Sequence, residues 1–415
     1  MNQKHMNDLS RDDLLKAYRL MVLSRRLDEK EIQLKNQSAT FFQISAAGHE
    51  AVQVAAGMLL RPGYDWIFPY YRDRALCLTL GVSPTTMLLG GVGSAEDPSS
   101  GGRQMPSHWS SRESHIVSPS SATGTQCLHA VGCAEAGVLA ATQRTADKAL
   151  ISAHDDEVVL VSLGEGATSE GEFWEALSAA CLGKLPVVYV IQDNGYAISV
   201  PVDAQTPGGS ISTLVERFPA LRTINIDGTN FLESYSGMHE AITYAQSRKG
   251  PALVHASVVR LHSHSLSDDQ KAYRSEEECK ADLEQDPLFL AYIQQPLFRQ
   301  IAERYNGDQV SVFRSMFMNK PARWEQTLPW HQDVGAGWRI DSNPITTVWT
   351  SLDDATIGNG CMQIVPGSHH HGIINDRHFL SDQEEVIYAP SEAVVNLEAE
   401  AGEAILLHNF LLHRS

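Results

Sequence analysis

Apolar segments of two lengths alternate along the first two thirds of the chain. Short apolar runs at 157–163, 186–192 and 252–259 have the length of buried strands. A segment at 170–183 and an Ala-rich stretch at 130–143 have the length and pattern of helices. Strands that are apolar on both faces and joined by helices are typical of a parallel sheet covered on both sides. The pattern therefore predicts an α/β, doubly wound parallel sheet.

The pattern changes near residues 290–300. Beyond this point the apolar runs are short and separated by Gly, Pro and Asn turns, as in TTVWTSL, CMQIVPG, AVVNLE and EAILLH. Such spacing is typical of an antiparallel β-sandwich or barrel. A chain of 415 residues is also too long for one ordinary core. We therefore expect two domains, at 1–292 and 293–415.

Two further features of the first domain predict local structure. Ser10, followed by Asp13 at the third position after it, predicts the start of a long amphipathic surface helix. The Gly- and Ser-rich segment from Gly90 to Trp109 predicts a long irregular loop. Loops of this length inside a compact domain are usually functional.

The composition narrows the classes of partner. The chain has 32 Lys and Arg against 50 Asp and Glu, a formal net charge of −18. Nucleic acids and anionic membranes bind through a cationic face, so we expect neither as a partner. The six cysteines form no CxxC pair, the N-terminus has no signal-peptide pattern, and no apolar run approaches membrane-spanning length. We expect a soluble, cytoplasmic protein.

Polar residues directly follow two of the predicted strands. Gly164, Glu165 and Gly166 follow the first strand, and Asn194 and Tyr196 follow the second. Right-handed crossovers bring the ends of successive parallel strands to one edge of a sheet, where ligands bind. A carboxylate, an amide oxygen and a backbone carbonyl are hard ligands that suit Mg²⁺ carrying the phosphates of a cofactor. The alternative is that the two glycines only form a tight turn.

The same segment does not fit two other phosphate-binding motifs. GEGATSEG lacks the third glycine of a dinucleotide fingerprint and the Gly-Lys-Ser/Thr ending of a P-loop. Between the two strands, Ser169 and Glu172 predict a capping box that opens the helix at 170–183 near the cofactor.

Longer strings resemble one enzyme family. GEGATSEGEFWEAL and PVVYVIQDNGYAISVPV resemble the thiamine diphosphate motif of the E1 α components of branched-chain 2-oxoacid and pyruvate dehydrogenases. The resemblance covers residues 10–288 and includes GRQMPSH, TGTQCLHAVG and HSHSLSDDQKAYRS. It implies a thiamine diphosphate-binding fold for the first domain. It also implies that Glu165, Asn194 and the main chain of Tyr196 bind Mg²⁺, with Gly164 and Gly166 in the cofactor-binding loop.

The resemblance implies roles for three more residues. Tyr71 and Arg72, in FPYYRD, match the positions that touch the diphosphate, and a planar guanidinium pairs well with phosphate. His264 matches the loop histidine that reaches the cofactor, and it is the expected catalytic residue. The alternatives are a surface salt bridge for Arg72 and a solvated loop position for His264.

The family's activity is the thiamine diphosphate- and Mg²⁺-dependent oxidative decarboxylation of a 2-oxo acid, after which a lipoyl group on an E2 partner accepts the acyl fragment. Half of the family's active site lies on a β part, and no recognisable β part follows residue 290. We therefore expect an E1 β-like subunit, a lipoyl-bearing E2, a small 2-oxo acid substrate and an oligomer. The sequence does not indicate which 2-oxo acid is used.

His331, Asp333 and His413 form a second chemical pattern. Two histidines and one carboxylate are the facial triad of non-haem Fe(II) oxygenases. LPWHQDVGAGW, TTVWTSLDDATIGNGCMQIVPGSHHHG and AGEAILLHNFLLHRS resemble the phytanoyl-CoA dioxygenase family in order and spacing. This resemblance, over residues 300–415, implies a partial all-β double-stranded β-helix (jelly roll). It further implies that the triad binds Fe²⁺ and that 2-oxoglutarate is the co-substrate.

Neighbouring residues bear on this second pattern. His408 competes for the distal position, but the LLHRS sequence around His413 favours His413. The triplet His369–His371 lies in a PGSH turn and is expected at the surface. The family's 2-oxoglutarate arginine follows the distal histidine at a greater distance than Arg414 does, so we expect a truncated dioxygenase domain.

Three functional hypotheses remain at this point. The first is an E1 α-like half that needs a β partner. The second is a chain with two activities, or one that acts mainly as an Fe(II)/2-oxoglutarate hydroxylase. The third is a non-catalytic fusion product that only binds cofactor.

Overall fold

The computed structural model describes residues 9–142, 154–288, 292, 296–307, 328–334, 346–351 and 353–415. The chain divides into two units, Met1–Tyr292 and Ile293–Ser415. No helix in the described ranges is long and apolar enough to span a bilayer.

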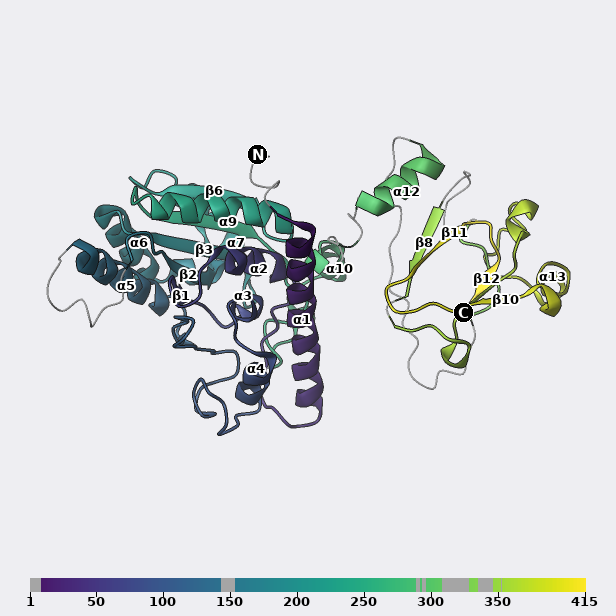
Figure 1. Cartoon of the computed structure of the whole chain (residues 1–415), viewed down its shortest axis with the longest axis horizontal. Coiled ribbons are helices and arrows are strands. Elements are labelled where there is room, and N and C mark those ends of the chain that lie inside the picture. The colour runs from purple at the N-terminus through teal and green to yellow at the C-terminus, as the bar shows by residue number, and fades with distance from the viewer. Residues whose placement is uncertain are drawn as a thin grey trace. The chain divides into compact units, whose positions relative to one another are not determined.

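A five-stranded parallel sheet forms the centre of the first unit (Figure 1). Its order is β1-β2-β3-β7-β6, and every neighbouring pair is parallel. The strands are β1 (Trp66–Phe68), β2 (Val159–Gly164), β3 (Val187–Asp193), β6 (Arg222–Asp227) and β7 (Ala252–Ser257). The predicted parallel α/β sheet is confirmed. The sequence predicted neither β1 nor β6, because β1 has only three residues and β6 is an edge strand, half exposed, without a continuous apolar run.

Alternate residues of the central strands point to opposite faces of this sheet. Leu160 and Val190 pack with α2 (Glu50–Leu59) and α9 (Phe231–Gln246) on one face. Val161 and Ile191 pack with α5 (Thr125–Thr142) and α6 (Gly171–Gly183) on the other. All four strand residues are buried. Helices on both sides therefore explain why these strands are largely apolar on both faces.

The long helix α1 (Arg11–Asn36) begins as predicted. Ser10 Oγ accepts the backbone N–H of Asp13 at 3.1 Å, and the backbone N–H of Ser10 donates to Asp13 Oδ2 at 3.0 Å. On the inner side of the helix, the buried carboxylates of Asp28 and Glu31 pair with Arg74 of α3 (Arg74–Thr79). Charge pairs as well as apolar contacts thus anchor α1 to the sheet domain.

Two local predictions have opposite outcomes. Helix α4 (Pro84–Gly91) is followed by turns and bends as far as Trp109, which confirms the irregular loop. The capping box of Ser169 and Glu172 is wrong. A 3-10 helix, η2 (Glu165–Ser169), precedes α6, whose N-cap is Glu170 with no side-chain cap bond. Ser169 Oγ instead accepts Nε2 of Gln205 at 3.1 Å, so this hydroxyl joins two loops.

Short elements complete the first unit around the carboxyl ends of the strands. They are β4 (Tyr196–Ala197), β5 (Val200–Pro201), α7 (Val202–Gln205), η3 (Pro207–Gly209), α8 (Ile211–Val215), η4 (Gln270–Ala272) and α10 (Glu276–Glu284).

The second unit contains two small antiparallel sheets among its described residues. One has the order β10-β9-β12 and the other pairs β11 with β8. Its elements are α12 (Pro296–Asn306), β8 (Thr346–Thr350), η5 (Ile357–Asn359), β9 (Met362–Ile364), η6 (Ser368–His371), α13 (Asp382–Tyr388), η7 (Ser391–Ala393), β10 (Val395–Leu397), β11 (Ala404–His408) and β12 (His413–Arg414). The predicted change from parallel to antiparallel pairing is confirmed.

Candidate functional site

The loops after β2 and β3 meet at the carboxyl edge of the sheet. Gly164, the last residue of β2, lies opposite Gln192 of β3. Gly166 lies so close to β4 that an added Cβ would stand 2.6 Å from Cβ of Ala197. A side chain at this position would push the two loops apart. The glycine is therefore needed for their close approach, and not only for a turn.

Glu165 lies at this junction with only 2% of its surface exposed. The hydroxyl of Thr206 donates to its Oε1. Oε2 is buried and accepts no hydrogen bond from the residues that the structure describes. Burial raises the pKa of this carboxyl, and the neighbouring charge of Asp193 raises it further. A buried carboxylate oxygen without a donor is costly unless a cation lies beside it, so this geometry fits a metal ligand.

Asn194 and Tyr196 lie on the second loop. Asn194 Oδ1 accepts the backbone N–H of Tyr196 at 3.3 Å, and its Nδ2 lies 3.4 Å from Nε2 of His49. The preceding Asp193 holds the loop, because its Oδ1 accepts the N–H of Gly195 at 2.8 Å and its Oδ2 lies 2.9 Å from Nε2 of His255. Asn194 thus carries an amide whose orientation neighbouring groups determine.

Tyr71, Arg72 and His264 also lie together, although 192 residues separate the last two. Arg72 Nη2 lies 3.1 Å from His264 Nδ1, and the rings of Tyr71 and His264 meet edge to face at 5.9 Å. Arg72 is 2% exposed, which rules out a surface salt bridge. Burial, with the charges of Arg72 and Arg260 near it, lowers the pKa of His264 to about 4. His264 is therefore a partly buried, neutral imidazole and not a solvated loop residue.

The sequence did not identify two buried polar residues behind this loop pair. His49 is fully buried and its Nδ1 lies 2.9 Å from Oε1 of Gln192. Gln192 in turn donates to Asp73 Oδ1 at 2.7 Å. Burial, with the charges of Arg72 and Arg260, lowers the pKa of His49 to about 3. These two positions follow no spacing rule, because they come from segments far apart in the sequence and share a hydrogen-bond network with a third, at Asp73.

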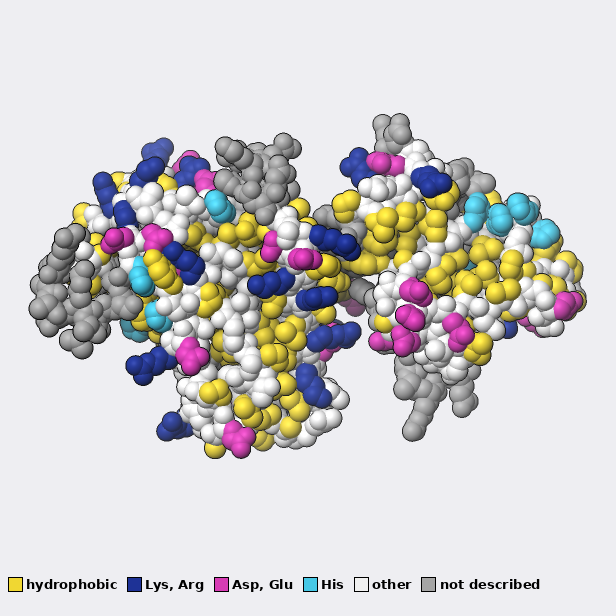
Figure 2. Space-filling model, in the orientation of Figure 1, with side chains coloured by type: hydrophobic (Ala, Val, Ile, Leu, Met, Phe, Trp, Pro, Cys, Tyr) yellow, Lys and Arg dark blue, Asp and Glu magenta, His cyan; other side chains and the backbone are white. Residues whose placement is uncertain are grey.

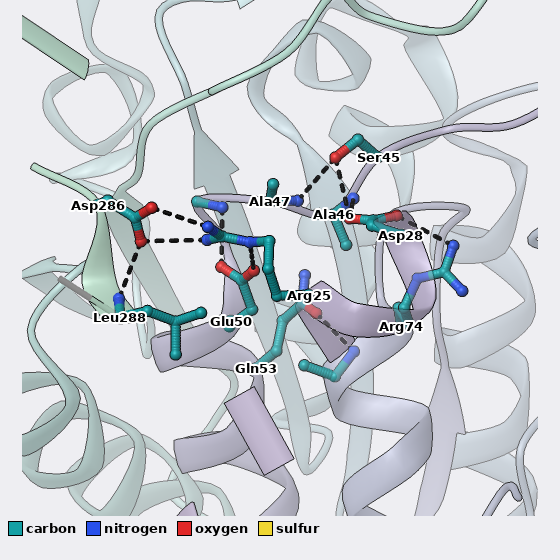
Figure 3. Close-up of polar contacts among 12 residues, drawn as sticks. Arg25, Asp28, Ser45, Ala46, Ala47, Glu50, Gln53, Arg74, Asp286 and Leu288 are labelled. Atoms are coloured by element: carbon teal, nitrogen blue, oxygen red, sulfur yellow. Dashed lines mark hydrogen bonds and ion pairs between the residues drawn. The ribbon is translucent and has the colours of Figure 1, made fainter. Parts of the chain in front are cut away.

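The segment that carries His49 is anchored on both sides. Figure 3 shows Arg25 between Glu50 and Asp286, with Arg25 Nε 2.8 Å from Glu50 Oε1 and Arg25 Nη1 2.8 Å from Asp286 Oδ2. On the other side, Asp28 accepts Ser45 Oγ at 2.9 Å and the N–H of Ala46 at 2.8 Å. The Ser45 carbonyl then accepts Arg72 Nη1 at 2.6 Å. This segment therefore fixes the guanidinium that faces His264.

A cavity of about 310 Å³ opens beside the end of β1. It is lined by Phe68, Pro69, Gln104, Val117, Ser118, Pro119, Ser120, Ser121, Gln126 and His129. Gln126 Nε2 donates to the Ser162 carbonyl at 3.2 Å, whereas its Oε1 is buried and accepts no hydrogen bond from the described residues. The cavity thus combines an apolar wall with polar groups that can bind a small polar molecule.

In the second unit, the structure brings His331, Asp333 and His413 together. One ligand atom from each lies within 4.8 Å of the others. The two histidines pair through their backbones, with N–H to carbonyl distances of 3.0 and 3.1 Å. Nδ1 of His331 lies 2.8 Å from the Pro329 carbonyl and Nδ1 of His413 lies 2.9 Å from the Leu411 carbonyl. Each Nδ1–H donates to its carbonyl, which leaves both Nε2 lone pairs available to a metal.

The alternative candidates in this unit lie elsewhere. His408 Nδ1 accepts the N–H of Phe410 at 3.0 Å, and His408 does not belong to the three-residue cluster. Arg414 stacks on Trp330 and donates to Gln363, so it has a structural role. Figure 2 shows histidine side chains gathered at the surface of this unit. His370 and His371 are exposed in η6, as predicted for the triplet, whereas His369 is half-buried.

Comparisons with known proteins match two overlapping parts of the chain to two different families. The family model "Dehydrogenase E1 component" matches residues 18–298, and "Phytanoyl-CoA dioxygenase (PhyH)" matches residues 237–415. The chain is 35% identical over 296 residues to the 2-oxoisovalerate dehydrogenase subunit alpha of Bacillus subtilis, covering 71% of this chain and 86% of that protein. It is 31% identical to the pyruvate dehydrogenase E1 component subunit alpha of Mycoplasma pneumoniae, covering 69% and 74%.

Among solved structures, a transketolase from Leishmania mexicana matches with a TM-score of 0.42 and 17% identity, covering 69% of this chain. This chain spans 47% of the length of that structure, and a likeness at this level carries no functional argument. The sequence relatives and the first family model decide the assignment. The chain belongs to the dehydrogenase E1 component family, and its second unit lies within the match to phytanoyl-CoA dioxygenase.

Proposed function

We propose that the first unit is the α-like half of a 2-oxoacid dehydrogenase E1, which binds thiamine diphosphate through Mg²⁺. Glu165, Asn194 and the main-chain oxygen of Tyr196 would hold the metal. The observation that carries this proposal is Glu165 Oε2, a buried carboxylate oxygen without a donor at the junction of the two loops. Hard oxygen ligands of these three kinds suit Mg²⁺.

Tyr71, Arg72 and His264 would bind the diphosphate next to the metal. Arg72 can only donate, so Nδ1 of His264 accepts and the proton of the neutral imidazole lies on Nε2. That N–H can donate to a phosphate oxygen or to a group that reacts beside it. When bound, thiamine diphosphate would supply the carbanion and the electron sink for decarboxylation. The cavity beside β1 would hold the side chain of a small 2-oxo acid.

The partners follow from the same assignment. The relatives are named as alpha subunits, which supports a second, β-like subunit that completes the site. A lipoyl-bearing E2 would accept the acyl group, and the enzyme would work as an oligomer.

A calorimetric titration of the full chain with thiamine diphosphate and Mg²⁺ tests the site. Asn194→Ala should weaken or abolish binding, because it removes a metal ligand. Asn396→Ala, an exposed position in the second unit, is the matched control and should bind as wild type does. Equal binding by wild type and Asn194→Ala, or no binding by either, would contradict the assignment.

A second activity is favoured by the geometry of the second unit. His331, Asp333 and His413 bring one carboxylate and two imidazoles together, a donor set that suits Fe²⁺ in a 2-oxoglutarate-dependent oxygenase. The two antiparallel sheets would then belong to a jelly roll. Fe²⁺-dependent turnover of 2-oxoglutarate should be lost in His331→Ala and kept in the exposed control His371→Ala. Turnover that survives in His331→Ala, or that is absent from the wild-type chain, would exclude this activity.

A further inference from the structure

The geometry points to His49 as a positioning residue for the metal site: its Nε2 accepts Nδ2 of Asn194 and so turns Oδ1 of that amide toward the Mg²⁺. This inference rests on the proposed function, because it takes Asn194 as a metal ligand. It concerns a residue that matches no motif in the sequence. A chain of hydrogen bonds leads from Gln53 through Gln192 to His49, and the backbone fixes its direction at the far end.

Gln53 is the fixed end of this chain. Its Oε1 accepts the backbone N–H of Ala75 at 3.0 Å, and its Nε2 donates to the backbone carbonyl of Arg72 at 3.0 Å. A backbone N–H only donates and a carbonyl only accepts, so the amide of Gln53 cannot be reversed. Nε2 of Gln53 is therefore a donor toward its next neighbour, Gln192.

Gln192 transmits this direction. Its Oε1 accepts Nε2 of Gln53 at 2.9 Å, while its own Nε2 faces Asp73 Oδ1 at 2.7 Å and Ser162 Oγ at 2.8 Å. The carboxylate of Asp73 is an acceptor, which fixes the same orientation independently. Oε1 of Gln192 is also the atom that faces Nδ1 of His49 at 2.9 Å. An oxygen that only accepts requires the imidazole proton to be on Nδ1.

The opposite nitrogen of His49 then carries a lone pair. Nε2 faces Nδ2 of Asn194 at 3.4 Å, so it can accept only from the NH₂ group of that amide. A reversed Asn194 would set its oxygen against this lone pair and its NH₂ group against the backbone N–H of Tyr196, which Oδ1 accepts at 3.3 Å, so His49 and this N–H favour the same orientation. His49 is fully buried and both of its nitrogens face hydrogen-bonding groups, so it has no further proton to exchange with substrate.

The backbone around His49 is fixed as well. Gly48 has φ +98°, and an added Cβ would stand 2.1 Å from the Val259 carbonyl oxygen. Its N–H donates to Glu50 Oε2 at 2.8 Å, and Arg25 holds the other oxygen of Glu50. The imidazole therefore cannot move away when Asn194 turns. Groups behind a metal ligand commonly set its orientation in this way.

The test measures the Mg²⁺ concentration that half-saturates the full chain at a fixed, saturating level of thiamine diphosphate, by calorimetry or intrinsic fluorescence. His49→Leu should raise this concentration roughly 10- to 100-fold, the usual effect of removing a group behind a metal ligand. His49→Gln should recover most of the loss, because its Oε1 can accept from the same NH₂ group. This variant also keeps the test informative if His49→Leu does not fold.

The decisive control is the Asn194→Asp background. An aspartate has no NH₂ group and sets an oxygen against the Nε2 lone pair of His49, so in this background His49→Leu should no longer weaken Mg²⁺ binding and should leave it unchanged or strengthen it. An equal loss in both backgrounds would mean a general structural role and would overturn the inference. Wild-type affinity in His49→Leu would also overturn it. If Asn194→Ala leaves Mg²⁺ affinity unchanged, the proposed metal site itself fails.

Discussion

Asp28 anchors residues 43–49, the segment that carries His49, and Asp28→Asn tests how much its carboxylate contributes to the stability of the first unit. Oδ2 accepts the N–H of Ala46 at 2.8 Å and Ser45 Oγ at 2.9 Å. Oδ1 accepts Gln43 Nε2 at 2.9 Å and lies 3.2 Å from Arg74 Nη2. An asparagine cannot satisfy all of these donors, because its NH₂ group must face either the backbone N–H or the guanidinium.

The expected loss follows from those contacts. A buried N–H without an acceptor costs about 1–3 kcal/mol, and a charge-assisted hydrogen bond contributes about 1.5–3 kcal/mol. Arg74 keeps its ion pair with Glu31, which limits the cost of losing its charge-assisted contact with Asp28. We expect the free energy of unfolding of the first unit to fall by about 3 kcal/mol, and its melting temperature by roughly 6–10 °C.

Hydrogen exchange of backbone amides in α1 and β2, measured as a function of urea concentration, reports the unfolding of this unit separately from that of the second unit. Asp12→Asn is the matched control, since Asp12 is exposed in the first turn of the same helix. The control should change the free energy of unfolding by no more than about 0.5 kcal/mol. If Asp28→Asn is no more destabilising than Asp12→Asn, the segment does not depend on the carboxylate and the reasoning is wrong.

Three other predictions concern Gly48, His264 and Gln332. Gly48→Ala should destabilise the first unit by more than about 1 kcal/mol because of its positive φ and the close Val259 carbonyl, whereas Gly132→Ala, in an open helical position, should be neutral or stabilising in the same thermal melt. Burial and Arg72 lower the pKa of His264 to about 4, so the unfolded chain takes up this proton at a higher pH than the folded chain does, and the free energy of unfolding falls from about pH 6.5 toward pH 4. Between pH 7 and pH 4.5, His264→Gln should therefore lose up to about 2–3 kcal/mol less of its free energy of unfolding than wild type does. Parallel profiles of unfolding free energy against pH for the two proteins would contradict this. Gln332→Leu should lower Fe²⁺ affinity roughly 10- to 100-fold, since its amide bonds hold three backbone groups beside the triad; an unchanged Fe²⁺ titration would refute that role.

The sequence predicted those parts of the molecule that follow from local pattern. The runs that became β2, β3 and β7 are largely apolar on both faces, and Ser10 with Asp13 forms the predicted cap. Ser169 and Glu172 have the same spacing, yet Gln205 takes the Ser169 hydroxyl, because a loop distant in sequence packs against it. Local spacing cannot indicate which tertiary partner competes for a side chain.

The same distinction applies to the residues of the candidate sites. Glu165 and Asn194 directly follow strands, and His331, Asp333 and His413 fall in motifs, so the sequence could predict their positions. His49 and Gln192 could not, since their importance arises from hydrogen bonds among segments as far apart as residues 49, 73 and 192. A sequence shows the residue types at these positions, but it does not show which nitrogen of an imidazole will carry the proton.

Arg72 and Arg260 are each 2% exposed, and neither has a carboxylate ion-pair partner within the described ranges. Their mutual repulsion lowers the stability of the folded unit until an anion lies between or beside them. Ligand affinity and folding stability are then linked quantities, and a bound oxyanion stabilises the fold by RT ln(1 + [L]/Kd). An anion bound at this edge of the sheet would pair with the two guanidinium groups, and it would thereby also help to keep the first unit folded.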